Sequence, residues 1–197
     1  MTADSSRGGW EGLLRGRPGL LLALAWGFAE ATVFFVIPDV FLSYVAILDW
    51  RSTWRHILAA IGGALLGGAM LFHWSRVDPQ MARSVVARVP FITEEMFARA
   101  AESLKVHGLT GIFIGSFSGL PYKLYAVEAP TYFSSAEFLL ATPPARFVRF
   151  FLVWMGFGAA GAWLKKNYAV RTSRLAKIHA FLWIVSYAIY WGRIVYR

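Results

Sequence analysis

The chain has 197 residues, of which 57% are hydrophobic and only 16% charged, and its mean hydropathy is +0.50. Soluble domains contain about a quarter charged residues, so this composition predicts an all-α integral membrane protein and excludes a large soluble domain. The chain carries a net charge of +9 and no cysteine, which excludes disulfides, thiolate catalysis and cysteine-ligated metal. Its basic residues stand in short segments beside apolar runs, a pattern that favours anionic lipid headgroups over nucleic acid as partners.

Residues 1–18 form an N-terminal segment that we predict to lie in the cytoplasm or at the membrane interface. Arginines in this segment precede an apolar run and the sequence Ala29-Glu30-Ala31, which together resemble a cleaved signal peptide. Because the apolar run continues through residues 32–37, we expect the segment to be retained.

Residues 19–48 form the first of two interrupted apolar regions. A break at Ile37-Pro38-Asp39 leaves only nine residues from Val40 to Leu48, too few to cross a bilayer core of about 30 Å. Backbone that is irregular at this depth must face protein or a water-filled cavity. We therefore predict a re-entrant helical hairpin with Pro38 as its hinge and with Asp39 capping the second half-helix.

The next two regions are an apolar and a polar one. Residues 55–75 have the length of a transmembrane helix, and Gly63 and Gly67 form a G-x-x-x-G step that predicts close helix contact. Residues 76–107 are polar, with helix starts expected at Pro79 and Thr93. The second of these helices is amphipathic and should end at Gly108.

Residues 109–133 form the second interrupted region. Its break at residues 118–121 again leaves segments too short to span, which predicts a second re-entrant hairpin with Gly119 and Pro121 as hinges. Residues 136–164 form a second transmembrane helix. Residues 165–197 form a basic loop and a last transmembrane helix over 175–192, whose Trp183, Tyr190 and Trp191 we expect to anchor it at the interface.

The order hairpin, span, hairpin, span predicts an inverted repeat with a polar cavity between the two hairpins. Charge placement agrees with a cytoplasmic N-terminus, because most basic residues outside the spans then fall inside. These are Arg7, Arg15, Arg17, Arg51, Arg55, Lys165, Lys166, Arg171, Arg174 and Lys177, whereas Arg193 and Arg197 fall outside.

Glu30 and Asp39 are the candidate proton-coupling residues. A carboxylate inside a membrane segment is costly unless it is paired, hydrated or protonated, so such residues are functional candidates. The alternatives are a shallow, snorkelling position for Glu30 and a purely capping role for Asp39.

Lys123, just after Pro121, is the first candidate substrate-binding residue, since a lysine near the start of a half-helix suits an anion such as a phosphate. Lys123 could instead pair with Glu128 or with Asp39 and lock the two hairpins together. Ser116 and Ser118 could donate to the same anion or only satisfy backbone carbonyls.

Arg146 and Arg149 begin the second transmembrane helix. We expect them to snorkel to the interface; in the alternative, one of them points inward as a second phosphate ligand. The chain shows no hydrolase elbow, metal motif, phosphate-binding loop or dinucleotide fingerprint. We therefore expect no enzyme activity, no metal and no cofactor.

The acid pair Glu30 and Asp39, the glycine-rich span and the second hairpin "GSFSGLPYKLYAVEAP" resemble the DedA family, also called the SNARE-associated or VTT-domain superfamily. The resemblance covers about residues 20–165. That family typically carries an R-F-x-P-G-x-R-like run in its second hairpin, whereas Ser116 stands near the first arginine here and Lys123 near the second, as expected for a divergent member.

The resemblance implies a multi-pass protein of the bacterial inner membrane that moves a lipid carrier such as undecaprenyl phosphate, coupled to protons through Glu30 and Asp39. Two alternatives stay open. The first is a membrane scaffold or assembly factor whose buried charges form a static lock, and the second is a proton-coupled antiporter of small ions or drugs. The expected partners are membrane lipids, either anionic phospholipid or polyprenyl phosphate, and homo-oligomer formation is left open.

Overall fold

The computed structural model describes residues 9–195, and all of their regular structure is helical. The elements are α1 (Trp10–Arg15), α2 (Arg17–Thr32), α3 (Asp39–Asp49), α4 (Thr53–Val77), α5 (Pro79–Ala87), α6 (Glu94–His107), α7 (Thr110–Ser118), α8 (Tyr122–Glu128), η2 (Ala129–Thr131), α9 (Ser135–Tyr168) and α10 (Thr172–Val195). The predicted placements of Arg7 and Arg197 concern positions outside the described residues.

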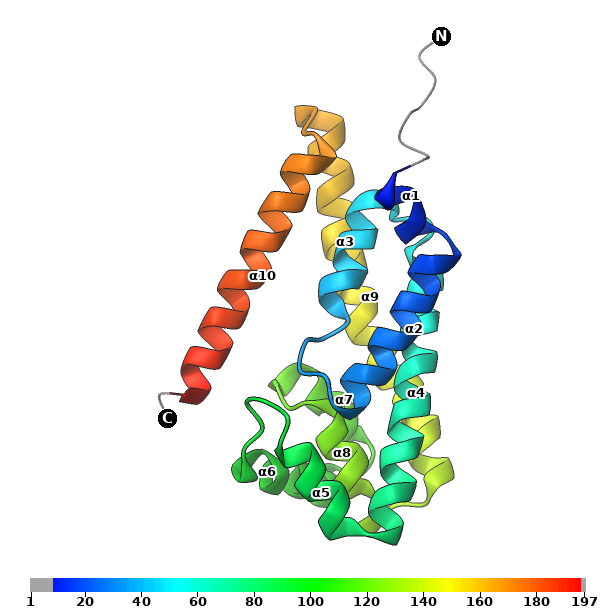
Figure 1. The fold of residues 1–197 in the computed structure, drawn as a ribbon, viewed down its shortest axis with the longest axis vertical. Helices are drawn as coiled ribbons and strands as arrows, with labels where there is room; N and C mark the ends of the chain where they lie inside the picture. Colours follow the sequence, from blue (N-terminus) through cyan, green and yellow to red (C-terminus); the bar gives the residue numbers. More distant parts are fainter. Residues whose placement is uncertain (1–8, 196–197) are drawn as a thin grey trace.

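Two helices, α4 and α9, are long and apolar enough to cross a membrane. They correspond to the predicted spans 55–75 and 136–164, and each is a few residues longer than predicted. The start of α9 is fixed by a capping box, in which the Ser134 side chain accepts from the Glu137 N–H and the Glu137 carboxylate accepts from the Ser134 N–H. In Figure 1, α4 and α9 run the length of the main helical body.

Each interrupted region folds as two helices joined by a turn. α2 and α3 lie in the upper half of the body in Figure 1, α7 and α8 lie in the lower half, and the turn between α2 and α3 reaches the middle. The second break falls where it was predicted, because Gly119 adopts the left-handed conformation (φ 79°) that ends α7. The first break spans residues 33–38 and begins earlier than the predicted Ile37-Pro38-Asp39.

Helices α2 and α4 pack closely through glycines. A Cβ added at Gly63 would lie 1.9 Å from the carbonyl oxygen of Leu24, and one added at Gly27 would lie 2.1 Å from that of Ala60. Only glycine therefore lets the two backbones approach to this distance. The close contact predicted for Gly63 is confirmed.

The polar region folds as two short helices at one end of the body. α5 begins at Pro79, where the Asp78 side chain accepts from the Met81 N–H at 3.0 Å, and α6 begins after Thr93 and ends at Gly108 (φ 60°). These boundaries were predicted. Buried side chains of α6 pack in one apolar cluster with residues of α4, α8 and α9, so α5 and α6 support the second hairpin from below.

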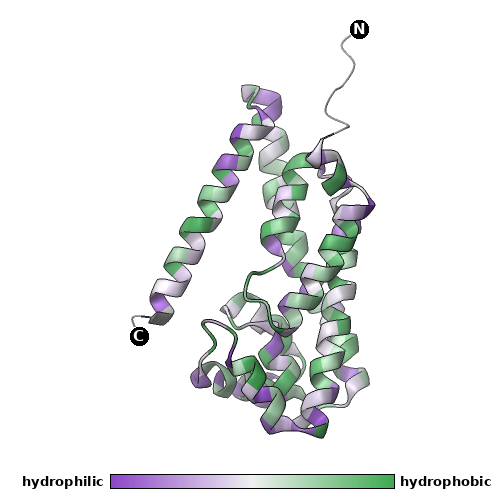
Figure 2. Ribbon diagram, viewed as in Figure 1, coloured by the Kyte–Doolittle hydropathy of each residue, from purple (hydrophilic) through white to green (hydrophobic). Residues whose placement is uncertain are grey.

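The last helix, α10, stands to one side of the body and joins α9 through a turn at Ala169–Arg171 (Figure 1). It covers residues 175–192, which were predicted to form a third transmembrane helix, but among the described helices only α4 and α9 are long and apolar enough to cross a membrane. In Figure 2, apolar colour predominates along the long helices, whereas hydrophilic residues gather at the α9–α10 turn and around α5 and α6.

Candidate functional site: buried ion pairs between two helical hairpins

The turn between α2 and α3 is held by side chains that bind its backbone. The Lys123 Nζ of α8 donates to the Phe34 carbonyl at 2.6 Å, and the Trp26 Nε1 donates to the Val36 carbonyl at 2.9 Å. From α10, the Tyr187 hydroxyl accepts the Ile37 N–H at 2.9 Å. These contacts satisfy two carbonyls and one N–H group of the turn, where the backbone is not helical. They also bring the second hairpin against the first.

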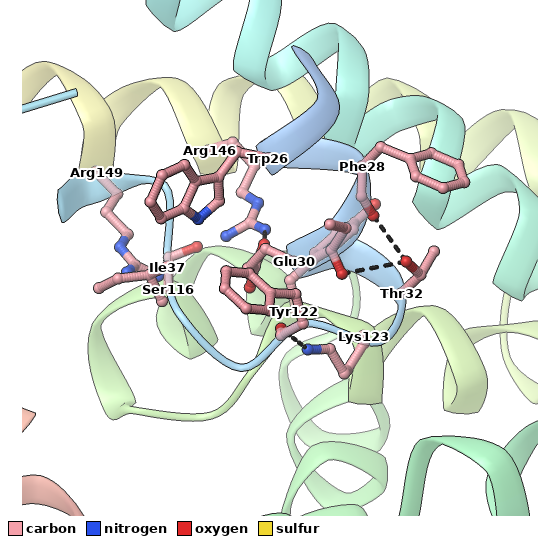
Figure 3. A network of polar contacts seen from close by, with 12 residues as sticks. Trp26, Phe28, Glu30, Thr32, Ile37, Ser116, Tyr122, Lys123, Arg146 and Arg149 are labelled. Carbon is pink, nitrogen blue, oxygen red and sulfur yellow. Dashed lines mark hydrogen bonds and ion pairs between the residues drawn. The ribbon is translucent and has the colours of Figure 1, made fainter. Parts of the chain in front are cut away.

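Glu30, near the end of α2, forms an ion pair with Arg146 of α9. Figure 3 shows Arg146 extending toward Glu30 above Tyr122. Both charged side chains are buried, with 1% of Arg146 and 2% of Glu30 exposed. The Arg146 guanidinium lies 4.5 Å from the ring centroid of Tyr122, and its Nε has no hydrogen-bond partner among the described residues. The pair therefore has little contact with solvent.

Asp39, the first residue of α3, forms a second ion pair with α9. The Arg149 Nε and Nη2 donate to its two carboxylate oxygens at 3.1 and 2.8 Å, the two-point geometry in which Arg–carboxylate pairs are strongest. Two predictions are corrected here. Arg146 and Arg149 do not snorkel to an interface, because both face the interior carboxylates. Asp39 does not cap α3, because Pro38 holds the cap position and no side chain caps the helix.

Lys123 lies beside these pairs without a carboxylate of its own. Its side chain is 1% exposed and donates only to the Phe34 carbonyl among the residues described. The predicted pairs of Lys123 with Glu128 and with Asp39 are both wrong. Glu128 instead pairs with Arg83 at 2.9 Å and lines a separate, smaller cavity, because the turn of α8 points Lys123 and Glu128 in different directions.

A cavity of about 450 Å³ lies between the two turns and α10. One wall is polar and carries Glu30, Asp39, Lys123 and Arg149. The rest is mostly apolar and aromatic, from the end of α7, the segment 89–92, α9 and α10. The cavity therefore offers a charged surface to one part of a ligand and an apolar surface to another part.

The remaining predicted residues fall in and around this cavity. Ser116 lines it and donates to the Ile112 carbonyl at 3.2 Å, whereas Ser118 donates to the Gly115 carbonyl at 3.3 Å and is not part of the lining. The hinge residues Gly119 and Pro121 line it from the second turn. The serines thus satisfy carbonyls of their own helix, as one of the two sequence interpretations stated.

Sequence reasoning missed the role of the α10 aromatics. Trp183, Tyr190 and Trp191 were expected to be interfacial anchors, but all three line the cavity together with Tyr187. The Tyr190 hydroxyl donates to the Gly119 carbonyl at 2.8 Å. Trp183, Tyr187 and Trp191 recur at every fourth position and so lie on one helix face, which is the only sequence signal for a shared wall.

The cluster joins three cations, Lys123, Arg146 and Arg149, to two carboxylates, Glu30 and Asp39. One positive charge is therefore left over when all five groups are ionised. In the part of the chain that the structure describes, no group of three His, Cys, Asp or Glu side chains could hold a metal ion. The site is chemically suited to binding an anion. It is also suited to an exchange in which an arginine releases one carboxylate and pairs with another anionic group.

Comparison of the chain with models of protein families, with curated proteins and with solved structures finds no match.

Proposed function

We propose that the protein is a membrane transporter that moves a lipid with an anionic, phosphate-bearing headgroup across the bilayer. The observation that carries this proposal is a cavity wall that is otherwise apolar but carries two cations, Lys123 and Arg149, and two carboxylates, Glu30 and Asp39. A third cation, Arg146, pairs with Glu30 from outside the lining. Lys123 supplies the charge that no carboxylate balances, and the apolar lining suits the first carbons of a lipid chain. The resemblance to DedA proteins agrees with this substrate class.

A membrane location is supported by helix lengths and by exposed apolar surface. At a rise of 1.5 Å per residue, α4 with 25 residues and α9 with 34 span about 37 and 51 Å, more than the bilayer core of about 30 Å. Only 17% of the most apolar stretch of α9 is buried within the protein. Exposed apolar surface on this scale is stable in lipid and would aggregate in water.

The two helical hairpins fit re-entrant segments in an inverted repeat. The longest of their four helices, α2, has 16 residues and measures about 24 Å, and the others are shorter. None of them crosses a bilayer core alone, so each pair would enter and leave on one side. Both turns reach the ion-pair cluster, where protein side chains satisfy the irregular backbone as a membrane requires.

Glu30 and Asp39 are placed to link proton uptake to headgroup binding. Each holds an arginine while it is ionised. An arriving phosphate can replace a carboxylate as the arginine's partner. The carboxylate is planar and the phosphate tetrahedral, but each presents two oxygens that accept two N–H donors of the guanidinium. The displaced carboxylate, now unpaired and poorly hydrated, would then take up a proton.

A second candidate function is a static lock in a membrane scaffold or assembly factor. The specific observation that favours it is that both carboxylates are already paired with arginines. In this case the cluster would fix the two hairpins against α9 and bind no ligand. The excess charge of Lys123 is the feature that this candidate does not explain.

Transport is tested by reconstituting the purified chain into vesicles with a labelled polyprenyl phosphate and measuring its movement between leaflets, with and without a pH gradient. We expect acceleration over empty vesicles and at least a tenfold loss in Lys123→Met. The matched control is Lys166→Met, because Lys166 is exposed at the far end of α9. Equal rates for vesicles with and without protein would refute transport of this lipid.

A further inference from the structure

Helix α10 forms one side of the cavity, but among its described side chains only those near its beginning are buried. Leu175 and His179 are buried in its first two turns. From Ala180 to Arg193 every described side chain is exposed or only half-buried. Elements with few buried contacts open at lower free energy than the rest of a fold. The C-terminal half of α10 is therefore a weakly held wall of the cavity.

The beginning of α10 is anchored to α3 by polar contacts. The His179 Nε2 and the Ser43 Oγ share a hydrogen bond of 2.7 Å, and the Trp183 Nε1 donates to the same Ser43 oxygen at 3.1 Å. Just before the helix, Ala169 adopts the left-handed conformation, with φ 49°. A short connection at this end, together with these bonds, gives α10 a natural pivot.

The far half of α10 is held by two hydrogen bonds and by ring contacts of Trp191. Tyr187 accepts the Ile37 N–H of the first turn, and Tyr190 donates to the Gly119 carbonyl of the second turn. Near the end, the Trp191 ring stacks on Phe91 with centroids 4.5 Å apart and planes 8° apart. The Trp191 ring also lies 5.5 Å from the Phe35 ring of the first turn. The wall thus contacts both hairpin turns and the segment between α5 and α6.

Phe91, which contacts Trp191, has a strained backbone conformation. Its φ of 67° lies in the left-handed region, which is rare for a bulky residue without a short polar side chain. Such conformations persist where surrounding contacts hold them, and they cluster at ligand clamps and switches. Here the holding contacts are the rings of Trp191 and of Phe35, at centroid distances of 4.5 and 6.1 Å.

We propose that α10 is a hinged side wall that pivots near His179 and opens at its C-terminal half, with Phe91 and Trp191 as the latch. This inference rests on the proposed function and specifies how the site is reached. An opening on this side would let a charged headgroup slide to the ion-pair cluster while its chains stay outside. The outward side chains Phe181, Ile184 and Ile189 are apolar and exposed, so they stay compatible with lipid in both positions.

The latch is tested by cross-linking, which the absence of native cysteine makes straightforward. The double variant Phe91→Cys/Trp191→Cys is reconstituted and joined with a short bis-methanethiosulfonate cross-linker, which forms a disulfide with each cysteine and is released by reduction. We expect headgroup transport to fall at least tenfold on cross-linking and to recover on reduction. The control pair, Ser43→Cys/His179→Cys, lies at the pivot. Its transport rate should be the same before and after it is joined. Undiminished transport with the latch pair joined would overturn the hinged wall and leave the transport proposal standing.

A second measurement needs no transport. Spin labels at Arg88→Cys and Ile189→Cys, both exposed beside the latch, report the distance across the opening by pulsed electron resonance. We expect a second, longer distance. The fraction of molecules at this distance should rise several-fold in Trp191→Ala and on addition of a short-chain prenyl phosphate, but not with inorganic phosphate. A single distance under all conditions would refute the hinge. A second distance in protein that moves no lipid would support the hinge and reject the transport function.

Discussion

The ion pair between Glu30 and Arg146 makes a quantitative prediction about stability. Replacing Arg146 by Met removes the charge but keeps apolar contact with the Tyr122 ring, and it leaves the carboxylate of Glu30 buried without its partner. Breaking a buried pair in this way costs about 3–5 kcal/mol. At 1.4 kcal/mol per tenfold change, the ratio of folded to unfolded protein should fall by about 100-fold to about 4,000-fold.

The assay is reversible unfolding in detergent micelles, titrated with a denaturing detergent. Arg146→Met and Glu30→Gln are measured singly and together. In the double variant both charges are gone, so we expect it to recover most of the loss, to within about 1–2 kcal/mol of the parent protein. Glu94→Gln is the control, because Glu94 forms an ion pair with Arg83 at 2.7 Å but its side chain is 72% exposed. It should change stability by less than about 1 kcal/mol.

Two results would refute this reasoning. If the free energy of unfolding of Arg146→Met lies within about 1 kcal/mol of that of the parent protein, Glu30 does not depend on Arg146 for its charge. If the double variant is no more stable than Arg146→Met, the loss comes from packing around the guanidinium and the coupling between the two charges is absent.

Three further predictions use the same unfolding assay. Gly63→Ala should lower the stability of the fold by about 3 kcal/mol, because it forces α2 away from α4. The control Gly62→Ala should raise the stability by up to about 1 kcal/mol, because there is open space beside Gly62. Lys123→Met should leave stability nearly unchanged, because removing a buried charge without a carboxylate partner offsets the loss of its hydrogen bond to the Phe34 carbonyl. Tyr122→Phe should cost about 1 kcal/mol by removing its 2.8 Å hydrogen bond to a buried threonine, and Tyr132→Phe, at an exposed position, should cost less than about 0.5 kcal/mol.

Local sequence signals were sufficient to place most of the helices. Pro79, Thr93 and Gly108 set the boundaries of α5 and α6, and the left-handed Gly119 set the break in the second hairpin. These features act within a few residues of themselves, so one sequence contains all the information that they need.

The first break was placed too late because its cause is not local. Residues 33–37 are apolar and were expected to continue the helix, but α2 ends at Thr32. The backbone beyond it is held in irregular form by Trp26, Lys123 and Tyr187, two of which come from distant parts of the chain. Tertiary hydrogen bonds of this kind override helical propensity.

The pairing of the charges was also beyond local reasoning. Arg146 lies 116 positions from Glu30, and Arg149 lies 110 positions from Asp39. Being three residues apart, the two arginines share one helix face, but only the rotation of α9 decides whether that face points to lipid or inward. The cost of burying an unpaired carboxylate was the one available clue that two cations must be nearby.

Lys123 separates the transporter from the scaffold on physical grounds. A static lock is most stable when every buried charge has a partner, so an additional buried cation works against it. A binding site for an anion, by contrast, needs positive charge that is available before the ligand arrives. Lys123 meets this condition, since among the described residues its ammonium group bonds only to a carbonyl. If Lys123→Met leaves the stability of the fold unchanged and abolishes lipid movement, the buried lysine is retained for the ligand.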